Sequence, residues 1–255
     1  MNTINLELNL GITLRPEPLR FTTSDGKAIP YIALEGVKGV GKGTVLKELS
    51  EILKQSGINA VYLKPTQSLG DDSYWEQIDC ELPLRHLDWW REHLYAARSE
   101  LHTASIREQI SKSEMADKPI DVVIGDRSII TSVVTRCPDR PCPEELLKSF
   151  YRVRKLERSI PTPDTIIWLD ITWGELSKRL LGRERSYGLQ DETKTRIMAA
   201  REAYCSLSQY AIACDDHSPL GLIKWIKCNA STPVHTTARR ISRLIITEVM
   251  GERPA

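Results

Sequence analysis

The chain has 255 residues, of which 41% are apolar and 27% are charged, and its formal net charge is +1 at pH 7. This length suits one substantial domain or two small ones, and the mixed composition excludes a disordered chain. A net charge so close to zero provides no global attraction to nucleic acids or membrane surfaces. The sequence has no run of about 20 apolar residues, so we expect no membrane-spanning helix.

Residues 1–29 are polar, contain prolines and precede the first apolar segment. They lack the basic start and apolar centre of a secretory signal, and their acidic residues do not suit a transit peptide. The six cysteines are scattered and form no zinc-binding set, which favours reduced thiols and a cytoplasmic location. We predict an N-terminal extension over 1–29, either packed on the core or loose, followed by one domain over 30–255.

Short runs rich in β-branched residues alternate along the domain with longer stretches of helical periodicity. The predicted strands are 31–34, 60–63, 121–124, 165–169 and 222–227, and the predicted helices are 43–55, 84–113, 144–158, 191–213 and 235–250. A capping box over 172–175 predicts a further short helix, and Ser231 with Pro233 predicts a capped start of the last helix. This alternation is typical of an α/β fold whose parallel sheet is covered on both faces.

A phosphate-binding loop is predicted between the first strand and the first helix, because residues 36–42 (GVKGVGK) have the spacing G-x-x-x-x-G-K. The glycines allow a tight turn that directs N–H groups at phosphate oxygens, and the following helix adds its positive end. A nucleoside triphosphate is the predicted ligand, with Lys42 at its terminal phosphates and Thr44 as the nearest hydroxyl for phosphate or Mg²⁺. The predicted contacts are Gly36, Gly39, Val40, Gly41, Lys42, Gly43 and Thr44. Lys38 is an unexpected second cation in this loop.

The third predicted strand is followed by Asp126 and Arg127. Residues at the carboxyl end of a strand in an open α/β sheet face the ligand crevice. We interpret Asp126 as a Mg²⁺ ligand through water, and Arg127 as a cation for the transferring phosphoryl group or an acceptor phosphate. A surface ion pair is the alternative interpretation of these two residues.

Four segments together resemble the thymidylate kinase family of nucleoside monophosphate kinases over residues 31–250, namely ALEGVKGVGKGT, LYAARSELH, VVIGDRSIITSVV and PDTIIWLD with its following arginine-rich helix. Related deoxynucleoside kinases share this plan. The resemblance implies a P-loop NTPase-type three-layer α/β/α sandwich with a five-stranded parallel sheet and an arginine-rich lid. It also implies ATP with Mg²⁺ as the phosphoryl donor, in-line transfer of the γ-phosphoryl group, and a homodimer formed through helices beside the sheet.

The resemblance also implies where the lid and the acceptor lie. The lid falls in residues 177–192, where Arg179, Arg183 and Arg185 are candidates to neutralise charge during transfer. Adenine would lie between the lid and residues 229–233, which include Ser231. The loop after the second strand and the helix over 89–102 would line the acceptor, with contacts from Lys64, Pro65, Thr66, Tyr95, Arg98 and, in a register matched on His102, Ser99.

Lys38 and Lys64 stand where members of the resembled family commonly carry acids, and in nucleoside kinases the second acid activates the 5′-hydroxyl. A protonated lysine cannot accept that proton, which favours an acceptor that carries a phosphate. Both lysines pointing to solvent is the alternative interpretation.

The predicted function is therefore ATP-dependent phosphorylation of a nucleoside monophosphate, namely dTMP or a related pyrimidine nucleotide. Two alternatives stay open: a kinase for a deoxynucleoside or modified nucleotide with a hydroxyl acceptor, and a nucleotide-binding regulatory protein with a decayed acceptor site. The predicted partner is a small nucleotide. A membrane is not expected, and nucleic acid is disfavoured but stays open as a carrier of the acceptor.

Overall fold

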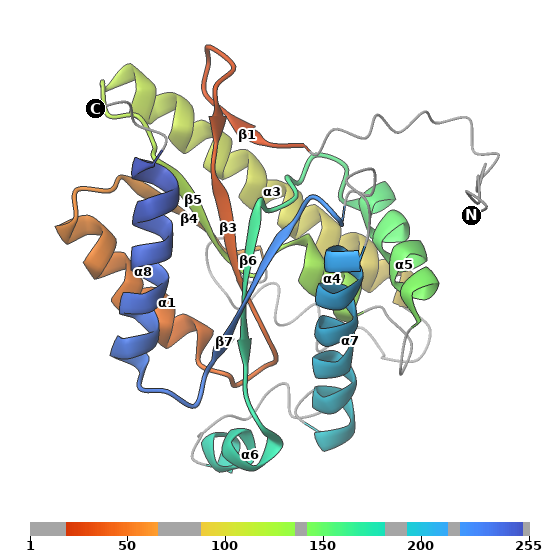
Figure 1. Ribbon diagram of the computed structural model, residues 1–255. Coiled ribbons are helices and arrows are strands. Elements are labelled where there is room, and N and C mark those ends of the chain that lie inside the picture. The colour runs from red at the N-terminus through yellow and green to blue at the C-terminus, as the bar shows by residue number, and fades with distance from the viewer. Residues whose placement is uncertain (1–18, 66–87, 136–141, 182–192, 214–219, 252–255) are drawn as a thin grey trace.

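A five-stranded parallel sheet forms the centre of the molecule (Figure 1). The computed structural model describes residues 19–65, 88–135, 142–181, 193–213 and 220–251. The strand order is β4-β5-β3-β6-β7. The strands are β3 (Tyr31–Glu35), β4 (Ala60–Leu63), β5 (Val122–Asp126), β6 (Thr165–Asp170) and β7 (Lys224–Asn229). The predicted parallel sheet is thus confirmed, with strand boundaries that differ from the predicted ones by no more than a few residues.

Helices cover both faces of this sheet, as the alternating sequence pattern predicts. One face packs against α1 (Lys42–Gln55) and α8 (Val234–Met250) in a single apolar cluster. The other face is covered by α3 (Asp88–Met115), α4 (Ile129–Thr135), α5 (Pro143–Leu156) and α7 (Lys194–Ala213). The short helix α6 (Trp173–Leu181) lies beyond the carboxyl edge of the sheet, at the bottom of Figure 1.

The register brings the carboxyl ends of the central strands to one edge. Leu34 in β3 pairs with Asp126 in β5, and Glu35 pairs with Trp168 in β6. The loop after β3 therefore begins beside the ends of both neighbouring strands. In open parallel sheets this edge is where ligands bind.

A small antiparallel hairpin precedes the sheet, formed by β1 (Phe21–Thr22) and β2 (Ala28–Ile29). Phe21 and Ile29 are buried, and the Phe21 ring meets the Tyr31 ring edge-on with centroids 5.4 Å apart. The hairpin is also tied to α3, because the backbone N–H of Ser24 donates to Glu114 at 3.0 Å. Residues 19–29 of the predicted extension thus pack on the core, and residues 1–18 lie outside the described part of the chain.

The helices differ from the predictions at two places: α4 was not predicted, and the last helix is not capped as expected. The apolar run Ile129–Thr135 forms α4 although it is rich in β-branched residues, because Ser128 caps its first turn and its side chains pack among those of α5 and α7. The last helix begins within one residue of its predicted start, but the predicted cap is wrong: Pro233 is the N-cap residue rather than a first-turn residue, and no side chain caps the helix by a hydrogen bond. The predicted short helix after Thr172 is confirmed as α6, with the Glu175 N–H donating to the Thr172 hydroxyl at 3.4 Å.

The helices in the described ranges include none that is both long and apolar enough to cross a membrane.

Candidate active site

The loop between β3 and α1 has the backbone that its glycines predict. Gly36, Gly39 and Gly41 adopt φ values of 141°, 89° and 102°. A Cβ atom on Gly36 would lie 2.5 Å from the Leu169 carbonyl oxygen, so the loop passes too close to β6 for any side chain there. Val40 is buried beneath the loop and anchors it to the core. This packing holds the loop in a tight turn at the carboxyl edge.

Lys42 begins α1 and is 7% exposed. Its ammonium group donates to the carbonyl oxygens of Gly36 at 2.8 Å and Val37 at 3.1 Å, which places the cation inside the turn. Gly43 and Thr44 follow in the first helical turn and are exposed. The first N–H groups of a helix have no partner within it, so this turn offers donors and a cation to an anionic ligand. The residues therefore fit the phosphates of a nucleotide.

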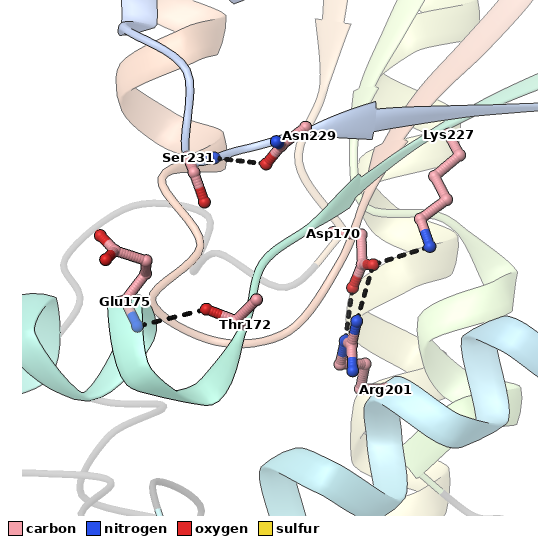
Figure 2. A network of polar contacts seen from close by, with 7 residues as sticks. All are labelled: Asp170, Thr172, Glu175, Arg201, Lys227, Asn229 and Ser231. Carbon is pink, nitrogen blue, oxygen red and sulfur yellow. Dashed lines mark hydrogen bonds and ion pairs between the residues drawn. The ribbon is translucent and has the colours of Figure 1, made fainter.

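Arg179 connects this loop to the segment after β7. Its guanidinium donates to the Val40 carbonyl oxygen at 2.8 Å and to the Ala230 carbonyl oxygen at 2.7 Å. Ser231 lies one residue further on, is exposed, and its N–H donates to the Asn229 side chain at 2.9 Å (Figure 2). The structure thus brings Arg179 and the predicted adenine segment together beside the phosphate loop.

Asp126 and Arg127 lie at the carboxyl end of β5, next to the loop, and both are half-buried. Arg127 is one of two non-glycine residues in the described ranges with a positive φ, here 79°. Its N–H donates to the Leu34 carbonyl oxygen at 3.1 Å, and its guanidinium donates to the Thr131 hydroxyl at 3.2 Å. The side chain of Arg127 is therefore held at its tip as well as at its backbone.

A buried carboxylate that the sequence analysis did not identify lies beside this turn. Glu35, the last residue of β3, is 0% exposed and accepts four hydrogen bonds. Ser128 donates through both its N–H and its hydroxyl, and the hydroxyls of Thr131 and Tyr204 donate to the second oxygen. A charged residue ending an otherwise apolar strand (YIALE) was the available signal.

A second buried carboxylate ends β6 (Figure 2). Asp170 is 8% exposed and accepts two hydrogen bonds from Arg201 of α7 and one from Lys227 of β7. Burial disfavours its charged form, but the hydrogen bonds and charges of Arg201 and Lys227 outweigh this effect and hold the pKa of Asp170 below its ordinary value. Sequence analysis missed this cluster because its three members are far apart along the chain.

The predicted acceptor residues are brought together in part. Arg98 of α3 donates to the Pro65 carbonyl oxygen at 3.1 Å and lies over the Tyr95 ring, 4.9 Å from its centroid. Lys64 follows β4, and Lys38 lies in the phosphate loop; both are half-buried. Ser99 is buried within the helix. Thr66, Arg183 and Arg185 fall outside the described residues.

A strand, a glycine-rich loop and a helix at the carboxyl edge of a five-stranded parallel sheet define a P-loop α/β protein, a class whose loop suits nucleotide phosphates. The sequence model of the family described as thymidylate kinase matches residues 34–213, which include this loop, the Asp126–Arg127 turn and the ion pair of Asp170 with Arg201. The chain belongs to the thymidylate kinase family. It is accordingly a nucleotide kinase of a family that uses ATP.

Several proteins named thymidylate kinase or probable thymidylate kinase are similar to this chain. The thymidylate kinase of Leptospira interrogans is 28% identical over 180 residues, covering 68% of this chain and 79% of the relative. The probable thymidylate kinase of Methanococcus maripaludis is 27% identical over 181 residues, covering 69% and 76%. The thymidylate kinase of Buchnera aphidicola is 25% identical over 183 residues, covering 69% and 81%.

Proposed function

We propose that this enzyme transfers the γ-phosphoryl group of ATP, bound with Mg²⁺, to the phosphate of a nucleoside monophosphate of the dTMP type. The observation that carries the proposal is the position of Arg127 beside the phosphate loop. Arg127 directly follows β5, and the loop directly follows β3, the strand that pairs with β5. One strand end thus presents the donor cradle, and its neighbour presents a fixed cation for the group in transfer. The names of the relatives support dTMP as the acceptor.

The donor side is served by the loop and the first turn of α1. Lys42 exchanges its contacts with the Gly36 and Val37 carbonyl oxygens for the terminal phosphates, while N–H groups of the loop surround the phosphate oxygens. Thr44 and Asp126 are the residues that would hold Mg²⁺, which supplies charge neutralisation of the phosphates when bound. The link from Arg179 to Val40 and Ala230 keeps the loop aligned with the adenine segment.

The transfer itself needs little proton chemistry from the protein. An ionised oxygen of the acceptor phosphate forms the new bond to the γ-phosphorus, the bond between this phosphorus and the bridging oxygen breaks, and ADP leaves with the electron pair. Arg127, with Arg183 and Arg185 of the proposed lid, neutralises the equatorial oxygens. Positioning and charge therefore supply most of the catalysis.

The two lysines near the acceptor favour this acceptor class over a hydroxyl group. Lys38 and Lys64 both follow strands of the sheet at its carboxyl edge, so they add positive charge where the acceptor enters. An acceptor hydroxyl would need a base in this region, and a protonated lysine does not supply one. A phosphate group needs no base and is attracted by both cations.

The experiment that tests the proposal measures ADP release with ATP and Mg²⁺ across matched pairs of nucleosides and their 5′-monophosphates. We expect turnover with dTMP or another pyrimidine monophosphate and at least about hundredfold lower kcat/KM with the corresponding nucleoside, as binding differences of a few kcal/mol produce. Turnover of thymidine in preference to dTMP, or tight ATP binding without turnover of any acceptor, would refute the proposal.

Two lysines of α1 provide a matched test of the donor site. Lys42→Ala should abolish transfer without loss of the fold, because it removes the cation at the terminal phosphates. Lys47 is exposed on the same helix, so Lys47→Ala should retain wild-type activity. Retained activity in the Lys42 variant would contradict its assigned role.

A further inference from the structure

We propose that Glu35 is a positioning residue, which holds Arg127 in the orientation that phosphoryl transfer requires. The inference rests on the role of Arg127 proposed above. It extends that role to Glu35, which is fully buried and so contacts neither the donor phosphates nor the acceptor phosphate. It is carried by the contacts between Glu35 and the turn that contains Arg127.

The turn at Arg127 needs support from its surroundings. A non-glycine residue at φ 79° is in a conformation that L-residues adopt rarely and that persists only where neighbouring contacts hold it. The chain folds back so tightly that a Cβ atom on Gly125 would lie 2.6 Å from the Arg127 carbonyl oxygen. The Tyr31 hydroxyl contacts this oxygen at 3.5 Å, a long hydrogen bond that is weak on its own.

Glu35 supplies the strong contacts. Its Oε1 atom accepts from the N–H and the hydroxyl of Ser128 at 2.8 and 2.7 Å, which fixes the backbone one residue after Arg127. Its Oε2 atom accepts from the Thr131 hydroxyl at 2.7 Å. That hydroxyl in turn accepts from the Arg127 guanidinium at 3.2 Å. One carboxylate therefore determines both the backbone and the tip of the Arg127 side chain.

The position of Glu35 in the chain links this support to the donor site. Glu35 ends β3 and directly precedes Gly36, the first glycine of the phosphate loop. The same residue therefore fixes where Arg127 lies relative to the donor phosphates. It also accepts from Tyr204 of α7 at 2.8 Å, so a third element is held in the same network. A carboxylate with no exposed surface is unfavourable unless hydrogen bonds compensate it, and all four of these bonds do so.

The first test is Glu35→Gln, which keeps the shape of the side chain and removes its charge. The amide nitrogen cannot accept, so either the Ser128 N–H loses its partner or the Thr131 and Tyr204 hydroxyls must reorient. We expect kcat to fall about tenfold to hundredfold, as a displaced cation of the active site does, while the Kd for ATP changes less than about twofold. A purely structural role would lower the melting temperature and leave kcat per folded enzyme unchanged, and that result would refute the proposal.

A double-mutant cycle tests whether Glu35 acts through Arg127. In the Arg127→Ala background, Glu35→Gln should change kcat less than about twofold, because there is no guanidinium left to position. Equal losses from Glu35→Gln in both backgrounds would refute the proposal. Arg127→Ala alone addresses the proposed function: unchanged kcat in that single variant would overturn the role of Arg127, whereas a large loss there with normal kcat in Glu35→Gln would overturn only the positioning role.

Two further variants keep the test decisive if Glu35→Gln folds poorly. Thr131→Val removes the hydroxyl between Glu35 and Arg127 with almost no change of volume, and it should lower kcat severalfold with unchanged ATP affinity.

Asp164→Asn is the matched control, since Asp164 is a half-buried carboxylate before β6 at the opposite edge of the sheet, where it accepts from the Tyr31 N–H at 2.8 Å. Its kcat should equal that of the wild type. A wild-type kcat in Thr131→Val, or equal losses in both variants, would refute the proposal.

Discussion

Arg201 and Asp170 form a bidentate ion pair that joins helix α7 to the carboxyl end of β6. The Arg201 Nε and Nη2 atoms lie 2.6 and 2.9 Å from the two carboxylate oxygens (Figure 2). One helical turn later, Tyr204 donates to Glu35 at the end of the neighbouring strand β3. Two buried carboxylates on adjacent strands therefore anchor one face of α7 to the edge of the sheet where the phosphate loop lies.

The Asp170 ion pair predicts a pH-dependent contribution to stability. The pKa of Asp170 is lower in the folded protein than its ordinary value of 3.8, so its contribution is complete above that value and is lost as the pH falls through the lower folded pKa. We expect Asp170→Asn to lower the free energy of unfolding at pH 7 by about 1–2 kcal/mol, through loss of charge-assisted hydrogen bonds. The difference from the wild type, measured by urea unfolding, should shrink below pH 4.

Asp164 provides a control of opposite sign. Burial raises the pKa of Asp164 above its ordinary value in spite of hydrogen bonds and Arg20, so ionisation of this carboxyl lowers stability as the pH rises from 3.8 through the folded pKa. The stability of Asp164→Asn relative to the wild type should accordingly improve with rising pH. The same pH trend in both variants would contradict this account of the two carboxyl groups.

Arg179 allows a test of the link between the phosphate loop and the proposed adenine segment. Arg179→Ala removes the hydrogen bonds to the Val40 and Ala230 carbonyl oxygens, so both segments lose their shared donor. We expect the Kd for ATP, measured by calorimetry, to rise about tenfold, which corresponds to ~1.4 kcal/mol. The KM for the acceptor should change less than the Kd for ATP.

The neighbouring Lys178 is the control for Arg179. Its side chain is 76% exposed and contacts only Glu175 at 3.5 Å among the described ion pairs, so Lys178→Ala should bind ATP as the wild type does. Equal weakening in both variants would indicate a general effect of charge on α6, rather than the two specific hydrogen bonds.

Gly36 in the loop and Gly43 in the first turn of α1 should respond differently to substitution by alanine. Gly36→Ala places a Cβ atom 2.5 Å from the Leu169 carbonyl oxygen at a φ of 141°, and we expect a loss of stability above about 1 kcal/mol together with loss of ATP binding. Gly43→Ala meets nothing within 4 Å in the first turn of α1, and it should retain binding and gain up to about 0.5 kcal/mol from helix propensity. Thermal unfolding and ATP titration of both variants check this. Normal ATP binding by Gly36→Ala would contradict the close packing of the loop on β6.

The sequence was sufficient for the sheet and the donor loop because both have local signals. Apolar strands, helical periodicity and the GVKGVGK spacing are each complete within a few residues, and β3, α1 and Lys42 lie where these signals place them. The α4 helix was missed because local propensity favoured a strand, whereas packing decided the outcome.

The two buried carboxylate networks could not be predicted in the same way. Glu35 meets Tyr204 across 169 residues, and Asp170 meets Arg201 across 31. Such contacts follow from strand order and helix placement, which sequence spacing does not encode. The contact between Arg98 and Pro65 on the acceptor side could not be predicted from the sequence either, because it depends on α3 lying beside β4.

We expect Lys38 to influence which acceptor the enzyme prefers. The residue is half-buried in the loop that follows β3, at the edge of the sheet where we propose that the acceptor binds. Reversing its charge in Lys38→Asp should weaken a phosphate-bearing acceptor by at least about tenfold in kcat/KM, since close charges interact by a kcal/mol or more near a protein surface. The Kd for ATP should be affected less, and the loss for the monophosphate should diminish at high ionic strength.

Lys54→Asp makes the same reversal in the last turn of α1 and should leave kcat/KM unchanged. If Lys38→Asp retained the wild-type ratio of kcat/KM between a monophosphate and its nucleoside, Lys38 would not select the acceptor.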